Sequence, residues 1–213
     1  MALHSSTATL RQTLLSPWSF FADRSPRSGV GFGVVALVAV AHVLVVFVGL
    51  LLVGVRVATL DDGVGVGQAV SAVAGEILGA SLVLGVLVFV NWLLVSAVLH
   101  VPAKVAHGRG TFGDTLFVVA RSSPVALLVP VATVAATLLA VGEAGSAEAA
   151  ARQPGSLRGT VDGASALAVV AVLLWQGVIW VAGLERTHDM DGGQATAAVA
   201  VTVLLGLVVA LGA

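Results

Sequence analysis

Five long stretches of this chain contain no charged residue. They cover residues 30–55, 77–99, 122–142, 163–184 and 192–213. Each is long enough to cross about 30 Å of hydrocarbon as an α-helix that rises about 1.5 Å per residue. The stretches are rich in Val, Leu and Ala and lack the alternation of a membrane β-strand. The pattern predicts an all-α, polytopic integral membrane protein, a bundle of five transmembrane helices.

The segment before the third stretch carries a helix start signal. Thr111 and Asp114 have the spacing of a capping box, which predicts a short helix from about Phe112 to Ser123. This helix is expected to lie at the membrane surface or to continue into the third stretch with a bend at Pro124. Pro130 lies further inside and predicts a kink, because proline removes a backbone hydrogen bond.

Composition agrees with a membrane domain and excludes several functions. Of 213 residues, 58% are hydrophobic and 10% charged, whereas soluble domains carry about 25% charged residues. We expect an N-terminal segment, residues 1–28, and a five-helix domain, residues 29–213. The net charge of −1 offers no basic field for nucleic acid, and the absence of cysteine excludes thiolate metal sites and cysteine nucleophiles. The sequence predicts no catalytic residue, no metal site and no cofactor.

Lysine and arginine are unevenly divided between the two sides of the predicted bundle. Seven fall on the side of the N-terminal segment, namely Arg11, Arg24, Arg27, Lys104, Arg109, Arg121 and Arg186. Three fall on the other side, namely Arg56, Arg152 and Arg158. Cytoplasmic loops carry the excess of basic residues. We therefore expect a multi-pass protein of the cell membrane with a cytoplasmic N-terminus and its C-terminus outside.

Two segments on the predicted cytoplasmic side combine aromatic and basic residues. In the first, Trp18, Phe20 and Phe21 precede Arg24 and Arg27, which is typical of a short helix in the membrane interface. The same segment can instead pack on the protein's own cytoplasmic loops, and the two interpretations are compatible. The loop of residues 100–121 forms the second segment. The candidate contacts for the membrane or for a partner protein are Trp18, Phe20, Phe21, Lys104, Arg109 and Phe112.

A few polar residues lie within or beside the predicted spans. His42, Asn91 and Gln176 form a candidate intramembrane polar site, because such groups are costly in hydrocarbon. Hydrogen bonding between helices is the alternative, and it is favoured for all three residues. For His42 the reason is that no second intramembrane acid or histidine accompanies it. The tryptophans Trp92, Trp175 and Trp180 are expected as interfacial anchors. His100 and His107 lack the spacing of a metal site and are expected on a solvated cytoplasmic loop. His188 with Asp189 and Asp191 could bind a cation weakly, but a solvated turn is the favoured interpretation.

Three stretches, taken in order, resemble the Yip1 family of five-span membrane proteins. Residues 16–22 are similar to the P-x-x-F-F entry segment of its prokaryotic members. Residues 93–128 resemble the family's histidine, glycine-rich turn, short helix and proline, through His100, Gly108, Gly110, Thr111, Phe112, Thr115 and Pro124. Residues 175–195 resemble its last turn, through Trp180, Gly183, Leu184, Glu185 and His188. The resemblance implies five helices and a cytosolic N-terminus.

Eukaryotic members of that family act in traffic between ER and Golgi and contact small GTPases, but this shorter chain resembles the prokaryotic members, so that role is not transferred. The leading hypothesis is a non-enzymatic membrane protein that organises partner proteins or the bilayer through its cytoplasmic segments. The alternative is a small transporter or channel that uses His42, Asn91 and Gln176, since transporters place substrate sites at broken helices. An intramembrane enzyme comes last, because the sequence offers no pair of nucleophile and base.

Overall fold

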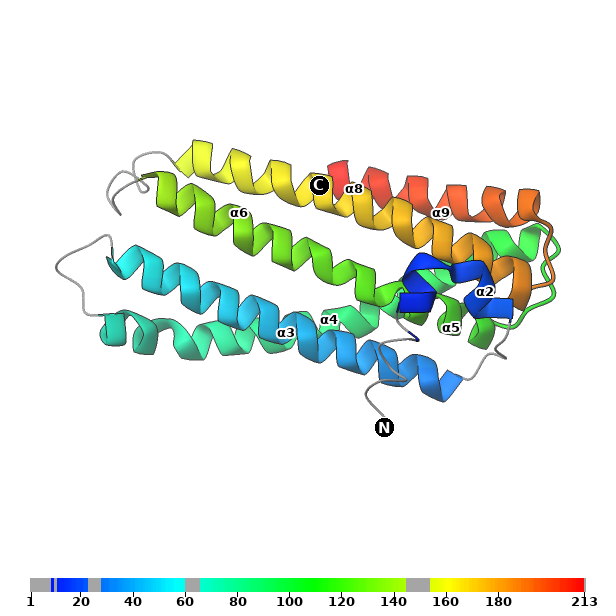
Figure 1. Cartoon of the computed structure of the whole chain (residues 1–213), viewed down its shortest axis with the longest axis horizontal. Coiled ribbons are helices and arrows are strands. Elements are labelled where there is room, and N and C mark those ends of the chain that lie inside the picture. Colours follow the sequence, from blue (N-terminus) through cyan, green and yellow to red (C-terminus); the bar gives the residue numbers. More distant parts are fainter. Residues whose placement is uncertain (1–8, 10, 23–27, 60–65, 145–153, 213) are drawn as a thin grey trace. The chain divides into compact units, whose positions relative to one another are not determined.

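The computed structural model describes residues 9, 11–22, 28–59, 66–144 and 154–212. These residues form helices joined by short turns, and no β-strand occurs among them. The elements are α2 (Pro17–Ala22), α3 (Ser28–Thr59), α4 (Val66–Val105), α5 (Phe112–Ser122), the 3₁₀ helix η1 (Ser123–Leu127), α6 (Leu128–Ala144), α8 (Pro154–Thr187) and α9 (Gly192–Gly212) (Figure 1).

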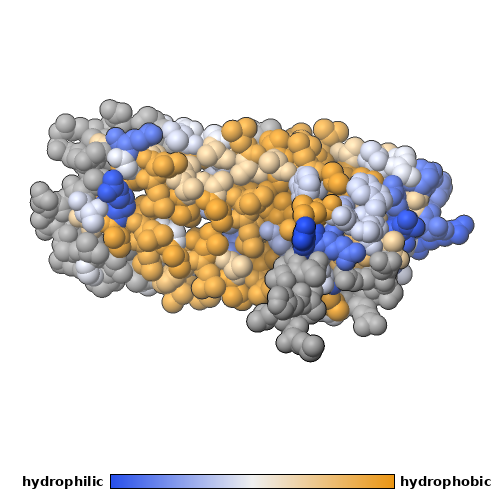
Figure 2. All heavy atoms as spheres, in the orientation of Figure 1, coloured by the Kyte–Doolittle hydropathy of each residue, from blue (hydrophilic) through white to orange (hydrophobic). Residues whose placement is uncertain are grey.

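Within the described residues, five helical stretches are long and apolar enough to cross a membrane. They are Gly29–Thr59, Leu78–Val105, Phe112–Ala144, Arg158–Thr187 and Gly192–Ala210. The predicted number of spans and the all-α class are therefore confirmed. Many leucines and valines on these helices are exposed, among them Leu37 at 66%, Leu94 at 60% and Val208 at 70%. Figure 2 shows hydrophobic residues over much of the long helices' surface, as lipid contact requires.

Two helices begin well before the charge-free stretches that predicted them. α4 starts at Val66 and α8 at Pro154, whereas the stretches start at residues 77 and 163. A charged side chain limits the part of a helix that lies in hydrocarbon but does not end the helix itself, because water can solvate the charge on the last turns. Arg158 and Asp162 illustrate this in α8, where they form an ion pair one turn apart at 3.3 Å.

The third span consists of α5, η1 and α6 in direct succession. The predicted capping box is confirmed, since the Thr111 hydroxyl accepts from the Asp114 amide and the Asp114 carboxylate accepts from the Thr111 amide. Pro124 is the second residue of η1, and Pro130 is the third residue of α6. The expectation that Pro130 lies inside a helix is corrected here: it occupies the first turn of α6, where backbone N–H groups lack intrahelical partners.

The chain divides into two compact units. Unit 1 comprises residues 1–38, 88–126 and 170–213, and unit 2 comprises residues 39–87 and 127–169. In unit 1, α5 is amphipathic and buries Phe117, Val118 and Ala120. Gly183 of α8 faces Val118 so closely that an added Cβ would lie 2.5 Å from a Val118 methyl carbon. The core of unit 1 is therefore built around α5.

Among its described residues, unit 2 packs through close contacts at glycines and through a hydrogen bond between helices. A Cβ added at Gly49 of α3 would collide with Val134 of α6, and one added at Gly85 of α4 would lie 2.8 Å from a Val43 methyl group of α3. The hydroxyls of Thr133 and Ser165 lie 2.8 Å apart. Small residues that let backbones approach are the usual means of helix association in lipid.

Candidate functional site

The loop between α4 and α5, residues 106–111, begins with a tight helix termination. His107 has a left-handed backbone with φ of 65°. The amide of Gly108 donates to the Ala103 carbonyl at 2.9 Å, and the amide of His107 donates to the Lys104 carbonyl at 3.0 Å. These are the contacts of a Schellman motif. The Lys104 ammonium then donates to the carbonyls of Gly108 and Gly110, each at 3.1 Å, and so fastens the loop to the end of α4.

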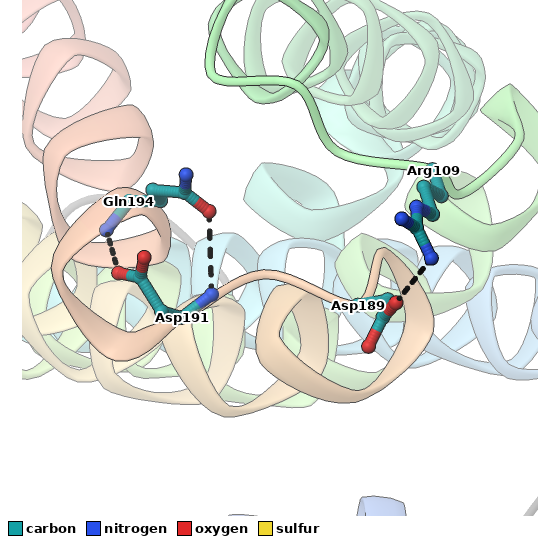
Figure 3. Close-up of polar contacts among 4 residues, drawn as sticks. All are labelled: Arg109, Asp189, Asp191 and Gln194. Carbon is teal, nitrogen blue, oxygen red and sulfur yellow. Dashed lines mark hydrogen bonds and ion pairs between the residues drawn. The ribbon is translucent and has the colours of Figure 1, made fainter.

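The turn between α8 and α9, residues 188–191, has a similar construction. Asp189 is left-handed with φ of 53°. The Asp191 carboxylate accepts from the Gln194 amide at 2.8 Å, and the Gln194 side-chain oxygen accepts from the Asp191 amide at 3.3 Å (Figure 3). This reciprocal pair satisfies N–H groups at the start of α9. We call the loop 106–111 and the turn 188–191 together the polar cap.

Two contacts join the loop and the turn directly. The backbone amide of Arg109 donates to the His188 carbonyl at 2.8 Å. The Arg109 guanidinium pairs with the Asp189 carboxylate at 3.1 Å, and both side chains are largely exposed, at 83% and 75% (Figure 3). An exposed pair of this kind contributes less than about 1 kcal/mol. The backbone bond and the packing beneath it therefore hold the polar cap together more than the ion pair does.

Glycines in the loop let its backbone lie against His188. A Cβ at Gly110 would lie 2.5 Å from the His188 ring. A Cβ at Gly108 would lie 2.8 Å from the Ala103 carbonyl and 3.1 Å from the Met190 sulfur. The distances of 2.5 Å at Gly110 and 2.8 Å at Gly108 are too short for a Cβ, so packing favours glycine at both positions.

Beneath the polar cap, two histidines and two threonines form one hydrogen-bonded chain. The Thr115 hydroxyl lies 2.9 Å from His100 Nδ1 and 3.0 Å from His188 Nε2. The Thr187 hydroxyl lies 2.8 Å from His188 Nδ1 and donates to the Gly183 carbonyl at 2.8 Å. We refer to His100, Thr115, Thr187 and His188 as the histidine–threonine chain.

The direction of this chain follows from its last bond. Because Thr187 uses its only proton on the Gly183 carbonyl, His188 Nδ1 must carry the proton that it shares with Thr187. His188 Nε2 is then the acceptor, Thr115 donates to it, and His100 Nδ1 donates to Thr115. The arrangement requires a neutral His188, which would lose its acceptor nitrogen on protonation.

The surroundings of His188 favour the neutral imidazole. His188 is fully buried. Burial lowers its pKa from 6.5 to about 4, the neighbouring His100 and Lys104 lower the pKa as well, and Asp114 raises it. The expectation that His188 and His100 lie on solvated loops is therefore corrected: His188 is in the core of unit 1, and His100 lies in α4 with its ring against Phe112 and His188.

Two of the three predicted anchor tryptophans are hydrogen-bonded within unit 1. Trp180 is 1% exposed and donates to the Ser122 hydroxyl at 2.7 Å, while Trp92 donates to the Leu116 carbonyl at 2.9 Å. Both bonds tie a long helix to the third span, so the expectation of interfacial anchoring is corrected for these two residues. Trp175 is 44% exposed.

Gln176 forms a hydrogen bond between helices. Its side-chain amide donates to the Ser122 carbonyl at 3.2 Å, which is one of the two roles that the sequence analysis considered for it.

The aromatic N-terminal segment packs on unit 1 itself. Phe20 is fully buried and Phe21 is nearly so. The ring of Phe21 is edge-on to that of Phe117, with the ring centres 6.2 Å apart. The Arg121 guanidinium lies between the rings of Phe20 and Phe117, at 5.2 and 5.1 Å from their centres. The expectation that Phe20 and Phe21 contact the membrane or a partner is therefore corrected, because the third span already covers them. Trp18 is 44% exposed and donates to the Glu185 carboxylate at 2.7 Å.

The other candidate contacts differ in what they offer. Lys104 holds the loop through two carbonyls, Arg109 is exposed beside Asp189, and Phe112 is 40% exposed over His100. The three intramembrane polar candidates do not share the cavity that His42 lines, since neither Asn91 nor Gln176 belongs to its lining. Asn91 is exposed on α4.

The chemistry of the histidine–threonine chain is limited by its burial. Thr115 and His188 have the hydroxyl–imidazole contact that nucleophile and base use, but both side chains are fully buried. The described part of the chain contains no group of three His, Cys, Asp or Glu side chains that could hold a metal ion. The arrangement is suited to holding the two turns of the polar cap in a fixed relation.

The sequence analysis did not predict the histidine–threonine chain, because its residues lie far apart in the sequence. Thr115 and His188 are separated by 73 positions, and neither matched a spacing pattern for chemistry. The available signal was the family resemblance. The residues that carry it, including His100, Gly108, Gly110, Thr115 and His188, meet beneath the polar cap.

Comparison with known proteins identifies the family of the chain. Neither the curated proteins nor the solved structures contain a significant match to the chain. The family model of the Yip1 domain matches residues 11–213, nearly the whole sequence. The match includes the aromatic segment, all five candidate spans and both turns of the polar cap. This membrane protein belongs to the Yip1 family.

Proposed function

We propose that this chain is a non-enzymatic membrane protein whose polar cap is a docking platform for a partner protein on the cytoplasmic side. The proposal rests on two oppositely charged side chains that are exposed to solvent while hydrogen bonds hold their backbone in place. Arg109 and Asp189 are largely exposed. Their backbones are joined through the Arg109–His188 hydrogen bond and lie on the buried histidine–threonine chain.

A fixed platform favours recognition by a protein. Surface loops that are already ordered lose little conformational entropy when a partner binds, so more of the contact energy appears as affinity. Figure 2 shows hydrophilic residues gathered at the end of unit 1 that carries the polar cap. The exposed Trp18 beside Glu185 adds an aromatic residue of the kind that interfaces concentrate.

The cytoplasmic side is supported by the distribution of basic residues. The sequence predicts seven lysines and arginines on the side of the polar cap and three on the other. Arg121 is 9% exposed and held by Phe20 and Phe117, so it contributes less to the bias than a loop residue does. The remaining excess still favours a cytoplasmic polar cap.

Exchanging the two charges tests the proposal. The double variant Arg109→Asp with Asp189→Arg keeps an ion pair in the polar cap and reverses the pattern that a partner meets. A photoreactive amino acid at the exposed position 186 reports contacts in native membranes. We expect the original chain to form a cross-link to one protein. In the exchanged variant, the yield of that cross-link should fall at least tenfold.

The control places the photoreactive residue at Val208, which is 70% exposed on α9 in the fifth candidate span, where lipid adducts are expected. Thermal unfolding in detergent checks that the exchanged variant is folded. The proposal fails if position 186 yields no protein adduct, or if the same adduct forms equally well after the charges are exchanged.

A further inference from the structure

A cavity of about 320 Å³ lies in unit 2 among α3, α4 and α6. Its wall contains His42 and Val46 from α3, Leu84 from α4, and Pro130, Thr133 and Thr137 from α6. The volume is at the lower end of the range of small-molecule sites, which is about 300–1,000 Å³. The described lining is apolar apart from the imidazole and the two threonine hydroxyls, and none of it is charged.

His42 enters this cavity without a partner of its own. It is half-buried and lies near the centre of the candidate span Gly29–Thr59. The described residues form no hydrogen bond to its ring. A neutral imidazole carries one donor and one acceptor, and leaving both unsatisfied at this depth of a bilayer is costly. A bound group that accepts from the ring N–H would lower that cost.

The threonines offer acceptors from the facing helix. The Thr137 hydroxyl donates to the Thr133 carbonyl at 2.8 Å, and the Thr133 hydroxyl donates to the Val129 carbonyl at 3.0 Å. Their protons are therefore used within α6. The Thr133 oxygen also accepts from the Ser165 hydroxyl at 2.8 Å, so Thr137 is the better acceptor for a group in the cavity. Because the two threonines are four residues apart, they lie on one face of α6.

We propose that this cavity binds an uncharged, lipid-soluble molecule that carries a hydroxyl group. The hydroxyl accepts from the His42 ring and donates to Thr137, while the apolar remainder lies against Val46 and Leu84. Ions are excluded, because no charged side chain among the described lining would compensate their loss of water. This site goes beyond the docking function, since it uses unit 2 alone and either can fail without the other.

The test compares two photoreactive probes on the purified full-length protein in vesicles. One is an eight-carbon alcohol with a diazirine group, and the other is the matching alkane without the hydroxyl. We expect the alcohol to label the segments around His42 and Thr137 in a saturable manner, as mapped by mass spectrometry, and the alkane to label them weakly and without saturation.

Two variants assign the effect to the named groups. His42→Leu and Thr137→Val should each weaken saturable labelling about three- to tenfold, the effect of losing one hydrogen bond. Thr137→Val keeps the shape of the side chain and decides the question if His42→Leu does not fold. Thr202→Val in α9 of unit 1 is the matched control, whose labelling by the alcohol should equal that of the original chain.

Two results would overturn the proposal. Equal labelling by the alkane and the alcohol would mean that the cavity is filled by hydrocarbon chains without a hydroxyl contact. Unchanged saturation in a folded Thr137→Val variant would mean that the proposed hydroxyl contact does not form, whatever the result for His42→Leu.

Discussion

His188 uses both ring nitrogens and its carbonyl to connect three parts of unit 1. Its Nδ1 donates to Thr187 in its own helix end, its Nε2 accepts from Thr115 of α5, and its carbonyl accepts from the Arg109 amide in the loop. A buried group with all of its polar atoms satisfied specifies one arrangement of its neighbours, because any displacement leaves a polar atom unpaired. His188 is the residue on which the geometry of the polar cap depends most.

Acid should weaken unit 1 through this residue. The pKa of His188 is about 4 in the folded protein and 6.5 when exposed, so below pH 6.5 the unfolded form binds the proton more readily. Stability is therefore complete above about pH 6.5 and falls as the pH drops toward 4. The pKa difference corresponds to a loss on the order of 3 kcal/mol. We expect a lower free energy of unfolding in detergent at pH 4.5 than at pH 7.5.

The variant His188→Gln isolates that effect. It retains His42, His100 and His107, so their contributions to the pH dependence are present in both proteins. We expect the variant to be less stable at pH 7.5 and to lose less stability on acidification. Parallel pH profiles for the two proteins would show that His188 does not titrate between its folded and unfolded values.

At the level of single elements, helix number and one helix start were predictable, whereas helix ends and turn packing were not. Charge-free stretches indicate the part of a helix that lies in hydrocarbon. They therefore located five spans but missed the first turns of α4 and α8. The capping box at Thr111 is local chemistry and was found. Pro130 was placed inside a helix because the sequence did not reveal η1, which shifts the start of α6 to Leu128.

The glycine-rich loop allows a matched pair of substitutions. Gly110→Ala would bring a Cβ to 2.5 Å from the His188 ring, whereas Gly113→Ala, three residues later in α5, meets only the Thr111 hydroxyl at 3.5 Å. We expect Gly110→Ala to destabilise the protein by about 1–3 kcal/mol through overpacking. Gly113→Ala should be neutral or slightly stabilising, since alanine favours helix.

Thermal unfolding in detergent measures both variants. A Gly110→Ala protein with the same melting temperature as Gly113→Ala would show that the loop backbone is not in contact with His188. The role assigned to the glycine would then be wrong.

For the whole molecule, the sequence predicted the class and the family better than it predicted the site. Low charge and long apolar stretches require lipid whatever the packing, so five spans followed from composition and pattern. Which side chains meet depends on long-range contacts such as Ser122 with Trp180, 58 positions apart. The placement of Phe20 and Phe21 also depends on long-range contacts. Their sequence pattern fitted an interface helix and a packed segment equally well, and in the structure they pack against Phe117 and Arg121.

The most direct test of the account asks whether α8 crosses the membrane with the polar cap inside. The chain has no cysteine, so single cysteines can be placed without background. Arg186→Cys and Gly155→Cys lie at opposite ends of α8 at exposed positions. With a membrane-impermeant maleimide, we predict labelling of Gly155→Cys in intact cells and of Arg186→Cys only after permeabilisation. Labelling of both cysteines from the same side would contradict the five-span arrangement.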